Sequence, residues 1–226
     1  MHFEVPKVPM HSFKDFTKHY LMIVLSILTA LGLEAWIEHT HHVHAAESAS
    51  AQIDEELRGT LADVRSSIKT NEERFLPMRE LDTAIAKDIR DGVPAVTINQ
   101  HIQAHKDDFR LSLNWPAFAS QAWDVAVANQ SASWIDPARL RQYSAAYADL
   151  RDASSWMTHD STLTLDAPHM STLRTRINLG IEVDPVEYLV VLRQMINTAA
   201  ETQSHLKQLE DHLVKALPAE AGKAHG

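Results

Sequence analysis

The densest group of side chains that could perform chemistry lies between residues 34 and 44, in EAWIEHTHHVH. Imidazole and carboxylate groups are ligands for Zn, Cu and Ni, and a helical pair four residues apart, such as Glu38 and His42, can chelate an ion. The alternative is an interfacial belt, in which His and Trp side chains lie at the level of lipid headgroups and Glu34 extends towards water. The candidate metal ligands of this run are His39, His42 and His44.

Helical spacing divides the same run into two faces. Glu34, Glu38 and His41 are separated by four and three residues, so they fall on one face of a helix. His39 and His42 point towards the side on which apolar residues recur farther along the chain. A carboxylate near the end of a membrane span is costly unless it extends to water or meets a polar partner. We therefore predict that this run contacts another protein through Glu34, Trp36, Glu38 and His41.

A second candidate metal site lies in HIQAHKDD, where His101, His105 and Asp108 are spaced to share a helix face. HxxxH is a metal-binding geometry, but the Glu that would make the motif HExxH is missing. The alternative is a solvated face, because Lys106 and Asp107 lie beside these residues. His101 and His105 are the candidate ligands.

Aromatic residues gather in the middle of the chain, where seven of the fifteen lie between residues 115 and 156. Such a cluster could line a pocket for a small apolar ligand. The alternative is that the rings fill a helical core, as aromatic residues at helical spacing commonly do. The seven residues are Trp115, Phe118, Trp123, Trp134, Tyr143, Tyr147 and Trp156.

Known catalytic patterns are missing from the sequence. It contains no Cys, no GxSxG and no Gly-rich phosphate loop, and the neighbours His159-Asp160 and Asp211-His212 have no recognisable third partner. Adjacent residues on a helix point to different sides, which favours surface positions for these two pairs. The formal charge of −9 opposes nucleic-acid binding. We expect no enzyme activity, no cofactor and no nucleic-acid partner.

The elements that position these residues are helices, because six Gly and nine Pro in 226 residues leave few sharp turns. Residues 20–37, YLMIVLSILTALGLEAWI, carry Glu34 as their only charge, and as a helix they cover about 27 Å. That length crosses the hydrocarbon core of a bilayer once. Two alternatives are a cleaved signal peptide with its site at Val43-His44-Ala45 and a buried core helix.

Basic residues set the expected orientation of this span. Lys7, Lys14 and Lys18 precede it, and no Lys or Arg follows it before Arg58. The positive-inside rule then puts residues 1–19 in the cytoplasm and the remainder outside, in the periplasm of a Gram-negative bacterium.

Beyond the span, one helix is predicted from about Lys14 to Leu76, with Ile53, Leu57, Leu61, Val64, Ile68 and Phe75 forming an apolar seam. Asn71 interrupts this seam; it could fix register or oligomeric state, but we expect it to be exposed. Asp136-Pro137, Asp184-Pro185 and Asp166-Ala167-Pro168 predict helix starts, and Trp115-Pro116 predicts another. The last helix, of about 32 residues, is expected to pair antiparallel with the first. Residues 159–165 are predicted as a loop.

The segment ALGLEAWIEHTHH, followed by an acidic amphipathic helix, resembles a class of uncharacterised bacterial single-pass inner-membrane proteins with an ALGLE-type anchor. Residues 120–150, a Trp-centred helix, a turn and a Tyr-rich helix, resemble the second block of that class. The resemblance covers about a third of the chain and implies a helical periplasmic domain, with no activity attached.

Together these patterns predict an all-α protein with four parts: a cytoplasmic tail (1–19), a transmembrane helix (20–37), an elongated periplasmic helical bundle (38–217) and a flexible tail (218–226). The expected function is that of a non-catalytic accessory or scaffold subunit, which binds other membrane-protein subunits or copies of itself. The alternative is a periplasmic sensor or binding module for a metal or a small apolar ligand.

Overall fold

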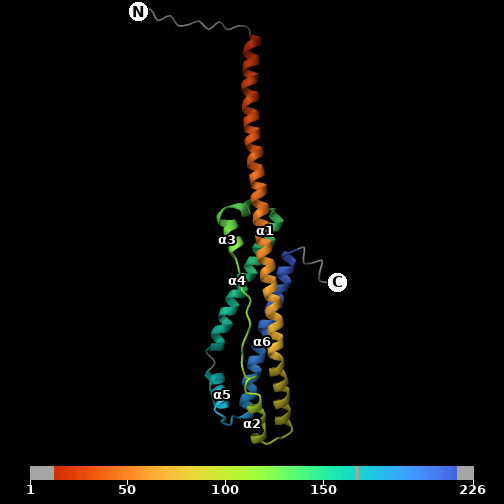
Figure 1. Cartoon of the computed structure of the whole chain (residues 1–226), viewed down its shortest axis with the longest axis vertical. Coiled ribbons are helices and arrows are strands. Elements are labelled where there is room, and N and C mark those ends of the chain that lie inside the picture. Colours follow the sequence, from red (N-terminus) through yellow and green to blue (C-terminus); the bar gives the residue numbers. More distant parts are fainter. Residues whose placement is uncertain (1–12, 166–167, 218–226) are drawn as a thin grey trace, which may run out of the picture.

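The computed structural model describes residues 13–165 and 168–217, and these form six α-helices, one 3₁₀ helix and no strand (Figure 1). The predicted all-α fold is confirmed. The elements in chain order are α1 (Phe13–Arg90), α2 (Ala95–Ala104), α3 (Gln121–Ala128), η1 (Ser131–Trp134), α4 (Pro137–Leu165), α5 (Pro168–Asn178) and α6 (Pro185–Ala216).

Helix α1 is the axis of the molecule, with 78 residues and a length of about 117 Å. Its first part projects alone from the bundle (Figure 1). The apolar stretch of this part, which is long enough to cross a membrane, is not buried inside the protein. It is the one helix among the described residues that is long and apolar enough to cross a membrane. We call the end of the bundle from which this part projects the near end, and the opposite end the far end.

The prediction that this helix ends at Leu76 is wrong, because α1 continues through Pro77 to Arg90. Pro77 is exposed, so water can hydrogen-bond to the carbonyl that its missing N–H leaves free. On the opposite side, Phe75, Met78 and Leu81 are buried. Packing of these residues holds both sides of the proline in one helix.

The bundle is built on α1 and α6, which run antiparallel as predicted, with α4 and α5 beside them (Figure 1). Two core clusters fill it. The near-end core joins the seam of α1 to α4 and to the end of α6, through Ile53, Leu57, Leu61, Val64, Tyr143, Tyr147, Leu209 and Leu213. The far-end core joins α1 to α2, α5 and the start of α6, through Phe75, Met78, Ile85, Ile98, Ile102, Leu173, Tyr188 and Leu192. The predicted seam is therefore core, with Ile68 partly buried at its middle.

Two of the predicted helix starts are confirmed by their capping bonds. The Asp136 carboxylate accepts from the backbone N–H of Ala138 and Arg139 at 2.9 and 3.1 Å. Asp184 accepts in the same way from the two residues after Pro185, at 2.9 and 2.8 Å. Helix α5 begins at Pro168, whereas Asp166 and the tail at 218–226 lie outside the described residues. Residues 159–165, predicted as a loop, are the last turns of α4, so that prediction is wrong.

The prediction that a helix begins at Trp115-Pro116 is also wrong. Residues 109–120 are an extended segment, here called the strap, which runs along the bundle from α2 at the far end to α3 at the near end (Figure 1). Pro116 is buried within the strap, and the next helix begins at Gln121.

Asn71, expected to be exposed, is 1 % exposed and holds the strap in place. Its side-chain amide donates to the carbonyl of Asn114 at 2.9 Å, and its side-chain oxygen accepts from the backbone N–H of Asn114 at 2.6 Å. The Asn114 amide also donates to the Ser67 hydroxyl at 3.0 Å. A polar residue in the seam thus pairs with backbone that has no helical partner.

Candidate functional site

The predicted partner-contact face lies on the free part of α1. Glu34, Glu38 and His41 line one shallow groove together with Ala30, Leu33 and Ile37, which confirms that the three polar residues share a face. All three are exposed and form no hydrogen bond or ion pair with the described residues. Trp36 is exposed as well. Contact of these four residues with another protein stays a prediction.

The remaining histidines of this run take separate positions. The ring of His42 stacks on Trp134 of η1, with centroids 3.5 Å apart and planes 9° apart. His39 is exposed, and His44 pairs with Glu47 on the same helix at 3.5 Å. In the described part of the chain, no three His, Asp or Glu side chains are grouped as a metal site.

His101 and His105 face different carboxylates. His101 Nδ1 lies 3.0 Å from Asp88 of α1, whereas His105 Nδ1 lies 3.1 Å from Asp108. The two rings meet edge to face at 5.3 Å. The prediction of one helix face for His101, His105 and Asp108 is wrong, because α2 ends at Ala104 and the following residues form a turn.

The predicted aromatic cluster separates into several groups. Trp123 stacks on Tyr147 with centroids 5.2 Å apart, and both belong to the near-end core. Tyr143 is buried beneath Arg139, and Trp134 lies against His42. Trp115 meets Trp156 edge to face at 5.6 Å. A single pocket lined by all of these rings is therefore ruled out, since they belong to different parts of the bundle.

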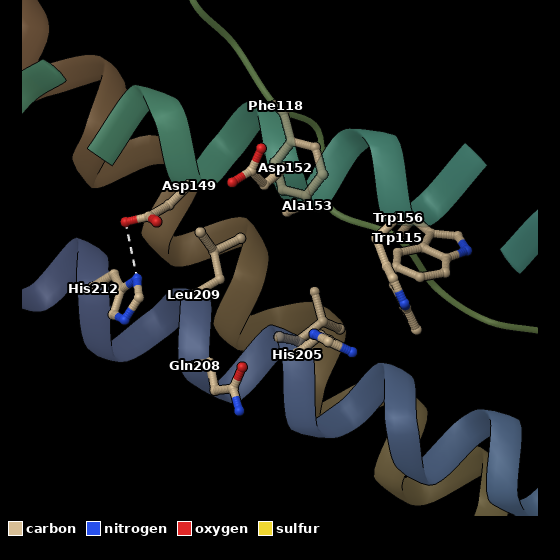
Figure 2. Close-up of a pocket in the computed structure, with 11 residues that line it drawn as sticks. Trp115, Phe118, Asp149, Asp152, Ala153, Trp156, His205, Gln208, Leu209 and His212 are labelled. Carbon is tan, nitrogen blue, oxygen red and sulfur yellow. Dashed lines mark hydrogen bonds and ion pairs between the residues drawn. The ribbon is translucent and has the colours of Figure 1, made fainter. Parts of the chain in front are cut away.

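Trp115 and Trp156, with Phe118, line a groove of about 260 Å³ between α4 and α6 (Figure 2). The strap supplies Trp115 and Phe118 over the groove. Four ionisable residues that the sequence did not single out as a site complete it together with Gln208: Asp149, Asp152, His205 and His212. Their spacings of three and seven residues put each pair on one face of its helix. Only the strap and the pairing of α4 with α6 bring the two faces together.

The polar groups of this groove are only partly paired. His212 Nδ1 lies 2.9 Å from the Asp149 carboxylate across the two helices (Figure 2). The His205 ring packs on Trp156 at 4.3 Å. Asp152 is exposed and forms no polar contact with the described residues. The groove thus combines aromatic walls with one available carboxylate, an arrangement suited to a small ligand that has an apolar body and a polar or cationic end.

A second polar cluster fastens α3 and α4 to α1 at the near end of the bundle. Asp54 accepts from Arg139 at 2.6 and 2.7 Å and from the Tyr143 hydroxyl at 2.7 Å. Glu56 accepts from the Tyr147 hydroxyl and from the backbone N–H of Ala122 at the start of α3. Burial raises the pKa of Tyr147, and its hydrogen bond to the Glu56 carboxylate raises this pKa further. The contacts of this cluster are structural.

No family model, curated protein or solved structure matches the chain. A functional proposal therefore depends on the geometry of these residues.

Proposed function

We propose that this chain is a single-pass, membrane-anchored accessory or scaffold subunit that acts by association, either with other membrane-protein subunits or with copies of itself. The observation that carries the proposal is the unbroken helix α1, in which an unburied apolar segment continues directly into the axis of a folded bundle. The proposed location is the bacterial inner membrane, with residues 1–19 in the cytoplasm and the bundle in the periplasm.

The composition of residues 20–37 supports a lipid environment. Their large apolar side chains project from α1 without any cover from the rest of the protein. Each such side chain is stabilised by about 1.5–3 kcal/mol when it leaves water. The three Lys residues before the span and the absence of Lys and Arg between it and Arg58 support the proposed orientation.

Two uncovered surfaces support association. The first is the face of α1 that carries Glu34, Glu38 and His41, which have no polar partner among the described residues. The second, the far-end patch, consists of exposed apolar residues around the turn between α5 and α6 (Figure 1): Leu179, Ile181, Val186 and Val190. Neighbouring exposed apolar side chains mark interaction surfaces on soluble domains.

A substitution series tests association through α1. Glu34→Leu should weaken the affinity of assembly about ten-fold, because a partner donor would lose its acceptor. The measured quantity is the oligomer fraction or the yield of a stoichiometric companion. Leu25→Ala is the packing control within the same span. Undiminished assembly in Glu34→Leu would show that Glu34 only extends to water and has no partner.

A second pair of variants tests the far-end patch. Val190→Asp places a charge within the patch, and Ser204→Asp places one on an exposed position of the same helix fourteen residues farther along, outside the patch. Association through the patch requires that Val190→Asp weaken assembly while Ser204→Asp leaves it unchanged. Equal assembly in both variants would remove the far-end patch from the proposal.

The groove under the strap favours a second candidate function, a binding module for a small ligand. Its aromatic walls and its unpaired Asp152 are the specific observation. Denaturing extraction of the purified full chain, followed by mass spectrometry, would identify a retained small molecule. Trp156→Ala should lose that molecule and Trp123→Ala should keep it. An empty wild-type protein would count against this candidate.

A further inference from the structure

We infer that the near end of the bundle rests on the membrane surface, with the Trp134 side chain in the lipid headgroup layer. This inference depends on the proposed function, since it takes residues 20–37 as a bilayer span. The occupant of the surface is lipid, and the contact comes from the cap formed by α3, η1 and their connecting turn. It would set the distance and the tilt of the domain above the bilayer.

The stacking of Trp134 on His42 fixes the depth of its indole relative to the span. His42 lies five residues beyond Ile37 on the continuous helix α1, which is about 7.5 Å along the axis. A bilayer core of about 30 Å lies within a total thickness of about 40–45 Å, so each headgroup layer is about 5–8 Å deep. The ring centroids of His42 and Trp134 are 3.5 Å apart. The indole is therefore held at the height of the headgroups.

The cap is constructed so that Trp134 meets α1. Gln130, between α3 and η1, has a φ of 64°, in the left-handed region that residues other than glycine seldom adopt. The Asn129 side chain accepts from the backbone N–H of Ser131 at 2.9 Å and holds this turn. The turn directs η1 back onto α1, where Trp134 contacts His42. A residue in an unfavourable conformation thus positions the aromatic side chain.

Trp134 stays 51 % exposed despite this stack. Val125 and Val127 of α3 are exposed at the same end of the bundle. An indole with one face covered and the rest open is typical of the aromatic belt of membrane proteins, where its apolar body meets lipid and its N–H meets water. Trp36, six residues before His42, is the second indole at this boundary.

The charges around the cap indicate whether the contact requires anionic lipid. Glu47, Asp124 and Asp136 are exposed on or beside it, as are His39, His41 and His44. The acidic side chains give no attraction to anionic lipid. Contact through the indole side chain is therefore expected on purely zwitterionic bilayers, and it should persist at high salt.

Fluorescence quenching of the full chain in phosphatidylcholine nanodiscs tests the inference. The quencher is phosphatidylcholine brominated on its acyl chains close to the headgroup. Trp134→Phe should remove a quenched component from the emission, and so should Trp36→Phe. Trp123→Phe is the matched control, since Trp123 stacks on Tyr147, which bonds to Glu56. Glu56 lies fourteen residues beyond His42, about 21 Å farther from the span.

Insertion of seven helix-forming residues between Ile37 and Glu38 provides a second, independent variant. It raises the bundle by about 10.5 Å and turns it by only about 20°, so the stack of His42 on Trp134 is kept. The quenching of Trp134 should be lost in this variant, while that of Trp36 should remain. Far-ultraviolet circular dichroism checks that the bundle is intact.

The outcomes separate this inference from the proposed function. Quenching of Trp36 without quenching of Trp134 would overturn the inference and leave the anchor standing. Failure to quench either indole would overturn the anchor and, with it, the inference. Shielding of Trp134 from aqueous iodide without quenching by brominated lipid would mean that protein covers the cap, and this would also overturn the inference.

Discussion

Two buried asparagine side chains supply hydrogen bonds that irregular backbone would otherwise lack. Asn71 pairs with both backbone groups of Asn114 in the strap. Asn99 does the same for Val183 in the turn before α6, at 3.0 and 2.8 Å. Buried N–H and C=O groups without partners are costly, and neither segment has a helical or strand partner. The two side chains thus attach nonhelical segments to the helical core.

Replacement of Asn71 should therefore destabilise the bundle. Asn71→Leu leaves the backbone groups of Asn114 without partners, and we expect a loss of about 1–3 kcal/mol in the free energy of unfolding. Asn197→Leu, on the exposed side of α6, is the control and should change it by less than about 0.5 kcal/mol. Chemical denaturation measures both variants. Equal effects would mean that the bonds of Asn71 contribute no stability.

Alkaline pH should unfold the bundle through its buried tyrosines. Burial raises the pKa of Tyr143, Tyr147 and Tyr188, with further increases from Asp54, Glu56 and Asp108 respectively. Because the folded-state pKa is raised, the stabilising contribution is complete below the unfolded value of about 10 and is lost as the pH rises above it. The unfolding midpoint in denaturant is expected to fall steeply from about pH 10.

Tyr188→Phe gives this expectation a clean variant. The Tyr188 hydroxyl is buried without a hydrogen-bond partner among the described residues, so its removal costs no bond. The variant should match or exceed wild-type stability at neutral pH and should retain more of it above pH 10. Tyr147→Phe loses the bond to Glu56 and should be weaker already at neutral pH. If the Tyr188→Phe variant lost stability above pH 10 as steeply as the wild type, Tyr188 would not contribute to the alkaline unfolding.

Among the elements, those marked by local chemistry were predictable from the sequence. Asp-Pro pairs mark the starts of α4 and α6, and recurring apolar residues mark the buried faces of α1 and α6. The strap was not predictable, because Trp115-Pro116 is typical of a helix start and the bonds that extend it come from Asn71, 43 residues away. The aromatic residues of the groove were among those predicted to line a pocket, but its polar residues were missed for the same reason, since its walls come from three distant segments.

The continuation of α1 through Pro77 is a second case in which packing overrides a local signal. Pro77→Ala restores one N–H to the helix and removes the ring, so we expect a stabilisation of about 1–3 kcal/mol. Arg79→Ala, at an exposed position of the same turn, is the control. Denaturant midpoints compare the two. A stability unchanged or lowered by Pro77→Ala would show that the bundle depends on a bend at this proline.

For the whole molecule, the proposed arrangement about a membrane was reached from the sequence alone, because a long apolar helix and its flanking charges can be read without tertiary information. The bundle beyond the span is different. Its near-end cap forms only when η1 folds back onto His42, and no pattern in residues 121–134 predicts that contact. The order of the helices was thus predictable, but the cap that α3 and η1 form against α1 was not.

Impermeant maleimide labelling should report the orientation of the whole chain, which has no native Cys. On spheroplasts, we expect the Glu201→Cys variant to react directly and the Ser12→Cys variant to react only after lysis. The intact mass should include residues 1–19, because the span is predicted to be uncleaved. The reverse labelling pattern, or a mass that begins after Ala45, would contradict the proposed anchor.

The strap has almost no slack between its bonded residue Asn114 and the first turn of α3. Asn114 is bonded to Asn71, and Ala122 is bonded to Glu56. The α1 residues are fifteen apart, a separation of about 22 Å along the axis, and the eight residues from Asn114 to Ala122 reach at most about 26–29 Å. Deletion of two residues shortens that reach to about 20–22 Å, so one fixed point would have to release. Extra residues would only bulge outwards, so evolution can lengthen this segment far more easily than it can shorten it.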